Sequence, residues 1–157
     1  MKEIIIKDLI LIYPEEFETV GEEETDQMKF YNDSKGICIR DNDRHMIITV
    51  GCKDVNLLAN FILSRKDLVK RTQSDIAAAM KSYQYKLIGM IDNMADGREI
   101  DGFNYEYIAE DIPMYGEAYV FKKNKTIYYL YLYSRKECVD NNMAVWKDII
   151  NNLRWKE

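Results

Sequence analysis

The segment 126–133 reads Thr-Ile-Tyr-Tyr-Leu-Tyr-Leu-Tyr, so β-branched, aromatic or leucine side chains occupy every position. Successive side chains of a β-strand point to opposite faces of the sheet, and a strand of this composition must therefore be covered on both sides. An amphipathic helix follows the segment, and two strand-like runs directly precede it. The pattern predicts a sheet with helices packed against it.

Short apolar runs separated by turn-forming residues occupy the first third of the chain. The runs are 9–13, 28–31, 36–40 and 45–50. Pro14 ends the first run, because its fixed φ and missing N–H suit a turn or the start of a helix. The separators 32–35 and 41–44 are rich in Asn and Asp, which bond to their own backbone in turns. This spacing predicts an antiparallel meander.

Two helices are predicted after this meander, one in the middle of the chain and one at its end. Ser64 stands three residues before Asp67, as in a capping box, and an apolar stripe follows at helical spacing: Val69, Thr72, Ile76, Met80 and Tyr83. The terminal helix begins near Asp140, and its stripe is Val139, Met143, Trp146, Ile150 and Leu153. Segment 55–62 is either a short helix or an irregular apolar segment.

Between the two helices lies a second, larger meander. Its predicted strands are 85–91, 102–109, 114–121 and 126–133, joined by short connections that make them antiparallel neighbours. The middle helix carries a basic outer face, which is typical of a solvated surface: Arg65, Lys66, Lys70, Arg71 and Lys81. The predicted fold class is α+β, an antiparallel sheet flanked by helices.

Composition and charge narrow the class of protein. A chain of 157 residues that is 47% hydrophobic and 31% charged is long enough for a single globular domain. Its net charge of −5 disfavours nucleic acid as a partner, because phosphate binding needs a positive surface. The chain contains neither a signal-peptide pattern nor a membrane-length apolar stretch, which predicts a cytoplasmic protein without stable membrane insertion, or an exported one if a signal has been removed.

Candidate metal and nucleophile motifs are weak. Cys38, Cys52 and Cys138 are odd in number and far apart, so they are interpreted as structural thiols, with His45 the single candidate base. Closely spaced oxygen ligands occur at 41–43 and 92–97, but neither segment has the full ligand set of a calcium loop, and each is interpreted as a turn. No metal and no cofactor are predicted.

A pair of carboxylates, Glu106 and Glu117, falls on adjacent predicted strands. Two carboxylates on a shared face can perform acid–base chemistry, as in glycosidases. Exposed cross-strand residues give the same pattern, and the pair has neither a sugar-binding nor an Arg-rich setting. The second interpretation is therefore favoured, and no catalytic residue is predicted.

An acidic segment near the start of the chain is the leading surface candidate. It contains seven carboxylates and no basic residue: Glu15, Glu16, Glu18, Glu22, Glu23, Glu24 and Asp26. Such a segment can attract a basic partner through long-range electrostatics. Charge runs are more often solvated loops, which is the favoured interpretation here, but Glu22, Glu23 and Glu24 are kept as candidate partner contacts.

Tyrosines line the strands of the second meander. Tyr105 and Tyr107 share one face of their strand, Tyr115 and Tyr119 share a face of the next, and Tyr129, Tyr131 and Tyr133 share a face of the last. If the three faces coincide, they form a continuous aromatic surface suited to an apolar helix or peptide. A helix covering that face would make it part of the core instead, and this alternative is slightly favoured because large exposed apolar patches are rare.

The order of elements resembles a known family. Tyr13-Pro14-Glu15-Glu16-Phe17 resembles the YPxxW/F opening of the PsbP-like group, which includes DcrB-like bacterial proteins, the Ran-binding Mog protein and Eag-type secretion chaperones. The tail Asn152-Leu153-Arg154-Trp155 resembles the end of their last helix. The resemblance implies one PsbP-like domain over residues 1–157, an α/β/α sandwich and a non-catalytic role in binding partners. Phe17 stands where Trp is common and the sequence shows no export signal, and these two departures from the family pattern disfavour photosystem-like and lipoprotein roles.

Together these features predict a non-enzymatic partner-binding protein, that is, an adaptor, a chaperone or an immunity-type antagonist, which binds a protein or peptide. Its predicted contacts are Tyr105, Tyr107, Tyr115, Tyr119, Tyr129, Tyr131, Glu22, Glu23 and Glu24. The alternative is a small hydrolytic or ligand-binding enzyme with a pocket between sheet and helix. A deep pocket with converging polar groups would favour the enzyme, and a shallow aromatic groove would favour partner binding.

Overall fold

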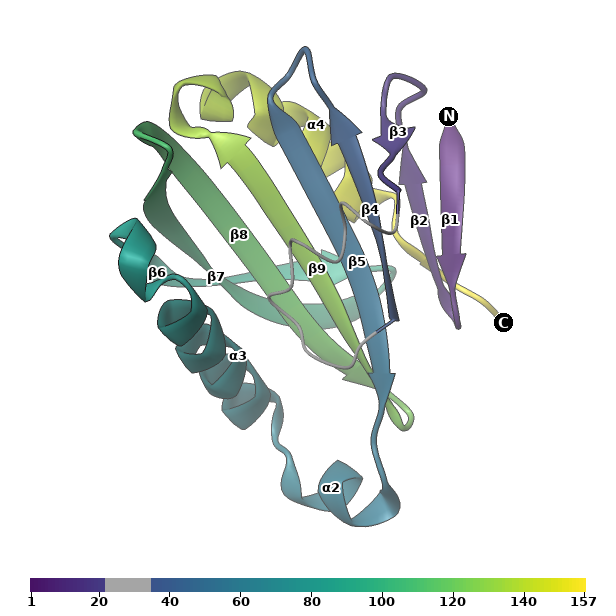
Figure 1. Ribbon diagram of the computed structural model, residues 1–157. Coiled ribbons are helices and arrows are strands. Elements are labelled where there is room, and N and C mark those ends of the chain that lie inside the picture. Colours follow the sequence, from purple (N-terminus) through teal and green to yellow (C-terminus); the bar gives the residue numbers. More distant parts are fainter. Residues whose placement is uncertain (22–34) are drawn as a thin grey trace.

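The computed structural model describes residues 1–21 and 35–157 (Figure 1). A seven-stranded antiparallel sheet forms its centre, in the order β3-β4-β5-β9-β8-β7-β6. In chain order its strands are β3 (Glu18–Thr19), β4 (Lys35–Asp41), β5 (Met46–Asp54), β6 (Lys86–Ala95), β7 (Arg98–Ala109), β8 (Ile112–Lys123) and β9 (Thr126–Arg135).

The two predicted meanders are joined into this one sheet through β9. Strand β9 pairs with β8 on one side and with β5 on the other, where Ile48 lies opposite Leu132. Every side chain from Thr126 to Tyr133 is buried except that of Tyr129, which is half-buried. The prediction that this segment is covered on both faces is confirmed, because an interior strand receives packing from both layers.

A second, three-stranded sheet holds both ends of the chain together. It consists of β1 (Lys2–Ile6), β2 (Leu9–Tyr13) and β10 (Arg154–Trp155), in the order β1-β2-β10. The prediction that 9–13 belongs to the same meander as 36–50 is therefore wrong: β2 finds its partners in β1 and in the tail. The predicted strand 28–31 lies outside the described residues.

Two longer helices cover opposite faces of the large sheet, α3 (Arg65–Ala79) and α4 (Val139–Asn151), as Figure 1 shows. Shorter pieces precede or follow them: α2 (Leu57–Ile62), η1 (Lys81–Tyr83) and η2 (Lys136–Cys138). Ser64 caps α3 as predicted, because its Oγ accepts a hydrogen bond from the Asp67 amide at 3.1 Å. Tyr83 was predicted to continue the buried stripe, but α3 ends at Ala79 and Tyr83 lies exposed in η1.

Each face of the large sheet has its own core. On one face, Leu68, Val69 and Ile76 of α3 pack against Phe103 and the neighbouring tyrosines. On the other, Trp146, Ile149 and Ile150 of α4 pack with the small sheet against the central strands. The predicted α+β class, an antiparallel sheet flanked by helices, is confirmed.

Candidate partner-binding site

The predicted tyrosine contacts lie on two faces of the sheet. A two-residue turn, Glu110–Asp111, joins β7 to β8 and pairs odd positions of one strand with even positions of the other, so that Tyr105 lies opposite Gly116. Gly116 in turn lies opposite Tyr133. Residues that pair directly share a face. The tyrosines of β7 and of odd positions in β9 therefore face α3, and those of β8 face α4. The condition that all three faces coincide is not met, so these tyrosines do not form one continuous surface.

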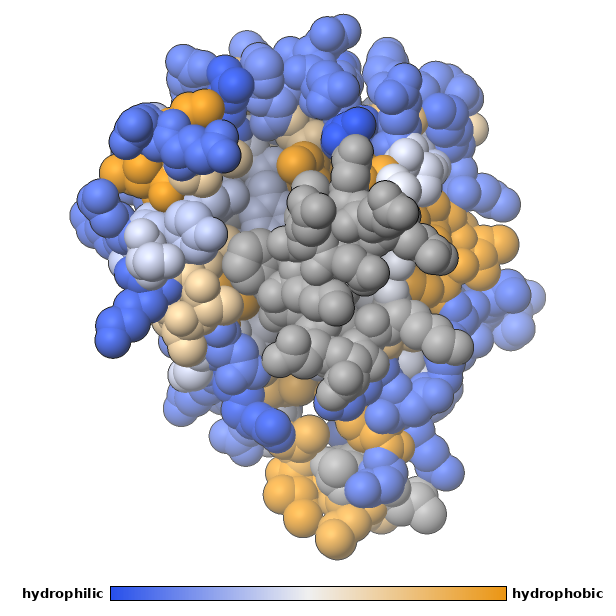
Figure 2. Space-filling view, in the orientation of Figure 1, coloured by the Kyte–Doolittle hydropathy of each residue, from blue (hydrophilic) through white to orange (hydrophobic). Residues whose placement is uncertain are grey.

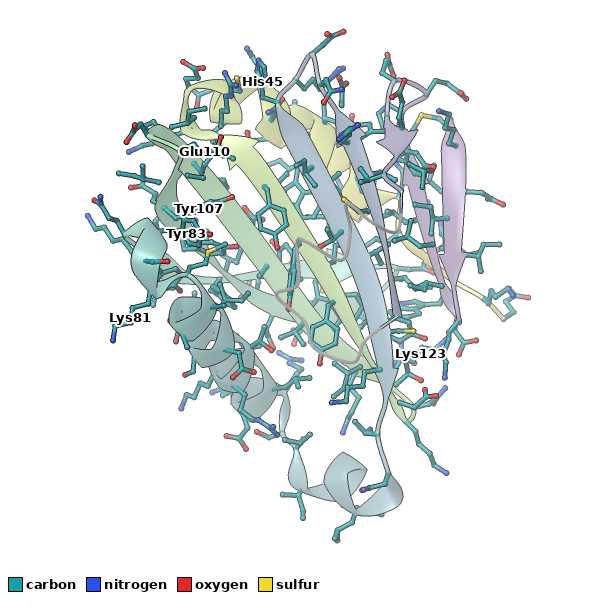
Figure 3. All side chains as sticks on the ribbon, in the orientation of Figure 1. His45, Lys81, Tyr83, Tyr107, Glu110 and Lys123 are labelled. Carbon is teal, nitrogen blue, oxygen red and sulfur yellow. The ribbon has the colours of Figure 1, made fainter. Side chains whose placement is uncertain are left out.

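These tyrosines also form much of the two cores. Tyr105, Tyr107 and Tyr131 are buried on the α3 side, and Tyr115 and Tyr119 are buried on the α4 side. Tyr129 is half-buried on the α3 side. Figure 3 shows Tyr107 on the sheet near Tyr83 of η1. As contacts to a partner these residues stay a prediction, and Tyr129 is the most accessible of the six.

Burial changes the acid–base chemistry of these tyrosines. It raises the pKa of Tyr105 and Tyr107 above the ordinary value of 10.0, because an ionised phenolate would lose its hydration in the core. Burial also raises the pKa of Tyr115 and Tyr119, and the neighbouring Glu117 carboxyl raises both further. All four phenols thus favour the neutral form in the folded state.

We expect the protein to lose stability as the pH rises above about 10. The unfolded chain releases these protons near the ordinary pKa of 10.0 while the folded state retains them, so the stabilisation is complete below that pH and declines above it. Denaturant titrations on both sides of this pH, with tyrosinate absorbance recorded in parallel, measure the effect. An unfolding free energy that stays constant above this pH would contradict the expectation.

The acidic candidates Glu22, Glu23 and Glu24 lie outside the described residues, and their role stays a prediction. Glu16 and Glu18, at the start of the same segment, are exposed.

The weaker candidate motifs have structural explanations. Asp41 stabilises its turn: its Oδ1 accepts a hydrogen bond from the Asp43 amide at 3.0 Å, and its Oδ2 pairs with Arg44 at 2.9 Å. Cys38 and Cys52 are buried, and His45 lies exposed in the β4–β5 turn. No group of three potential metal ligands occurs in the described ranges.

Glu117 is a further residue whose environment the sequence interpretation predicted wrongly. It is 4% exposed on the face of β8 beneath α4, whereas it was expected to be an exposed cross-strand residue. Its Oε1 accepts a hydrogen bond from Trp146 Nε1 at 2.9 Å, and its Oε2 accepts one from the Tyr115 hydroxyl at 2.7 Å. Glu106, on the same face, instead pairs with Lys136 at 3.1 Å. The carboxyl of Glu117 therefore joins sheet to helix, since its hydrogen bonds offset the cost of its burial.

The most exposed apolar strand is β6, at the edge of the large sheet. Leu87, Ile88, Met90 and Met94 are all exposed, with Met90 57% accessible. In the described part of the chain, β6 pairs only with β7 and ends the sheet order. An edge strand presents backbone N–H and C=O groups to solvent and is a template for another strand, particularly when its side chains are apolar. Sequence reasoning identified this strand but not its position at the edge.

A groove runs beside β6, between the sheet and α3. Its volume is about 550 Å³. Val69, Met90, Ile91 and Gly102 supply apolar walls, and the charged residues that line it are Arg65, Lys66, Lys70, Asp92 and Asp101. The Arg65 guanidinium is held by Asp101 and, at 2.8 Å, by Glu99. The groove can therefore accept an apolar side chain from a segment lying along β6, with charges available at its rim.

The fold of this chain is PsbP-like. CyanoP, the PsbP protein of the cyanobacterium Synechocystis sp. PCC 6803, superposes with a TM-score of 0.73 over 98% of this chain and 91% of its own, at 13% identity. PA94 of Pseudomonas aeruginosa, a protein of unknown function, matches with a TM-score of 0.57 over 78% of this chain and 83% of its own, at 12% identity. In sequence, no protein-family model and no curated protein matches this chain.

A third solved structure, from Bacteroides thetaiotaomicron, has a TM-score of 0.59 and covers 95% of this chain but 45% of its own length, at 8% identity. The resemblance to the PsbP-like group is thus confirmed at the level of the fold.

Proposed function

We propose that this protein is a non-enzymatic partner-binding protein, and that a protein or peptide partner adds to the edge strand β6. The observation that carries the proposal is the row of exposed apolar side chains on this strand, Leu87, Ile88, Met90 and Met94. An incoming extended segment can bond to the outer backbone of β6 while alternate side chains enter adjacent pockets.

The groove beside α3 is a suitable pocket for a side chain of such a segment. Met90 forms part of its wall, and methionine adapts its flexible, polarisable side chain to different apolar ligands. Lys66 and Lys70 line the groove and are exposed, so an acidic residue next to an apolar one in the partner would be favoured. The partner segment that fits best is extended, apolar and flanked by carboxylates.

The side chains that line this groove support binding better than catalysis. Its described lining residues include no histidine, cysteine, serine or threonine, and Arg65 is held by carboxylates on β7. A general base or nucleophile needs a partner group within hydrogen-bond reach that also faces the substrate. The alternative, a small enzyme with a pocket between sheet and helix, would have to use the cross-strand carboxylates Asp92 and Asp101, and Asp101 is already paired with Arg65.

Placement of a photo-cross-linking residue at Met90 tests the site. In the native host we expect a specific cross-linked partner from this position and none from Lys147, an exposed control position on α4. Met90→Lys with Met94→Lys should then weaken binding of the captured partner by at least about tenfold, since charges on an edge strand oppose strand addition.

Ile5→Lys serves as the matched control for these substitutions, because Ile5 is also an exposed apolar residue on an edge strand, that of the small sheet. It should bind the partner as the wild type does. Equal loss in both variants, or unchanged binding after Met90→Lys and Met94→Lys in a folded protein, would exclude β6 as the site. Loss that follows charge reversal at Glu22, Glu23 and Glu24 instead would place the contact on the acidic segment.

A further inference from the structure

We propose that the end of the molecule formed by α2 and the β8–β9 turn docks on the surface of an anionic lipid membrane. This inference does not rest on partner binding at β6, although Arg65 lines both the groove beside β6 and a hollow at this end of the molecule. It starts from α2, where Leu58, Phe61 and Ile62 are exposed and Phe61 is 86% accessible. Positions three and four apart share one side of a helix, so these three residues form a single apolar surface.

This apolar surface projects from the body of the protein. Figure 2 shows apolar side chains gathered at the bottom of the view, where Figure 1 places α2. Isolated exposed apolar residues are common, whereas three large ones together on a protruding helix mark a contact surface. Burial of this surface requires an apolar environment that a short helix can enter to a depth of one or two side chains. The boundary between lipid headgroups and acyl chains is such an environment.

The residues around α2 are predominantly cationic. The Val55 amide donates to the Lys125 carbonyl at 2.8 Å, and Lys122 Nζ donates to the Leu63 carbonyl at 3.4 Å, so the β8–β9 turn lies against both ends of the helix. The segments 53–56, 63–67 and 122–126 together contain six Lys or Arg residues and two Asp residues. The whole chain has a net charge of −5, so this end is opposite in sign to the rest.

A hollow of about 260 Å³, which Arg65 lines at the start of α3, offers a place for a lipid phosphate. Arg65, Arg98 and Lys122 line it together with Trp155. Glu99 also lines it, and Arg65 is paired with Glu99 at 2.8 Å and with Asp101, so a phosphate would be bound chiefly through Arg98 and Lys122. Lys123 lies 4.8 Å from the centre of the Trp155 ring, which keeps a further cation at the same end (Figure 3). Arginine and lysine donors are the groups that proteins use to bind phosphate.

An anionic membrane fits this combination better than other partners do. Nucleic acid would engage the cations but leave the apolar tip of α2 in water. An acidic protein surface could engage both, and is the competing outcome in the test below. None of the helices in the described ranges is long and apolar enough to cross a bilayer, so contact with lipid would be at the surface. A short apolar helix with a basic surround is the pattern of an interfacial anchor.

Co-sedimentation with lipid vesicles tests the proposal. At about 0.1 M salt, the protein should bind vesicles of phosphatidylcholine mixed with phosphatidylglycerol, bind pure phosphatidylcholine weakly, and dissociate as salt is raised. Phe61→Glu should abolish binding. Lys66→Glu with Lys125→Glu should weaken it by at least about tenfold, since each cation near an anionic surface contributes about fivefold.

Lys81→Glu with Lys147→Glu is the matched control. Both residues are exposed, they produce the same change in net charge, and Figure 3 shows Lys81 at the far end of α3 from α2. This variant should keep most of the vesicle binding. Equal loss in the two charge-reversal variants would overturn the proposal, because binding would then follow net charge alone. Absence of wild-type binding to the anionic vesicles would overturn it as well.

Phe61→Trp provides a second measurement that does not depend on loss of function. Because Phe61 is exposed, this substitution should leave the fold intact. The fluorescence of the new tryptophan, taken as the difference from the wild type with its Trp146 and Trp155, should shift to the blue on addition of anionic vesicles and be quenched by lipids brominated in the acyl chain. If the fluorescence instead responds only to an acidic protein and not to vesicles, the surface binds protein and the membrane proposal is wrong.

Discussion

Replacement of Trp146 by alanine is expected to lower the free energy of unfolding by about 3–5 kcal/mol. Trp146 is fully buried in the middle of α4, and its ring lies 6.4 Å from that of Tyr119 on the sheet. Its removal leaves a large cavity between helix and sheet, and it also leaves the Glu117 carboxyl without its indole donor. Urea titration measures the change, and a loss below about 1 kcal/mol would contradict the packing of α4 described here.

Trp146→Phe separates packing from hydrogen bonding. Phenylalanine fills most of the space but cannot donate to Glu117 Oε1. We therefore expect a smaller loss, about 1–3 kcal/mol, which corresponds to one buried polar group left without its partner together with a small change in volume. If the phenylalanine variant is as unstable as the alanine variant, the hydrogen bond to Glu117 dominates over the packing of the ring.

Replacement of Glu117 by alanine is expected to cost about 2–4 kcal/mol. The change removes the acceptor for two buried donors at once, Trp146 Nε1 and the Tyr115 hydroxyl. Each donor then lies in the core without an acceptor, although the Tyr115 hydroxyl still accepts a hydrogen bond from Asn104. A buried donor left without an acceptor costs more than the loss of both groups of a hydrogen bond. Glu117→Gln keeps the shape but offers only one acceptor oxygen to the two donors, so it should cost less than Glu117→Ala, about 1–3 kcal/mol.

A double-mutant cycle shows whether these residues act as a unit. When Trp146→Phe and Glu117→Ala are combined, the total loss should be smaller than the sum of the single losses, because both changes disrupt the same hydrogen bond. Additive losses would mean that the bond between Trp146 and Glu117 contributes little. In that case the stability of the α4 face would come from apolar packing alone.

Much of the local structure could be predicted from the sequence. The unbroken apolar composition of 126–133 predicted an interior strand, and Ser64 with Asp67 predicted the start of α3, because these signals depend on residues within one element. The stripe that ends in Ile150 and Leu153 likewise identified the buried side of the last helix. Period and capping are local properties, so a single sequence contains them in full.

The candidate site was less predictable, because it depends on how the strands align. Alternation shows which tyrosines of one strand share a face, but the register between strands decides whether Tyr105 and Tyr115 share one. The two-residue turn at Glu110–Asp111 placed them on opposite faces. Glu117 appeared to be a surface residue for the same reason: no property of β8 alone shows that Trp146, 29 positions later in the chain, donates to its carboxyl.

The sequence by itself determined which segments are apolar enough to form strands and which face of each long helix is apolar. It also determined that the net charge of the protein is negative. Only the tertiary structure decided that β6 lies at the edge with Met90 exposed, and that α2 projects with Phe61 in solvent instead of packing inward. The physical reason is that hydrophobic burial is a property of contacts between distant segments. Burial of an apolar side chain is favourable wherever it lies in the sequence, but the fold determines whether another part of the chain packs against it.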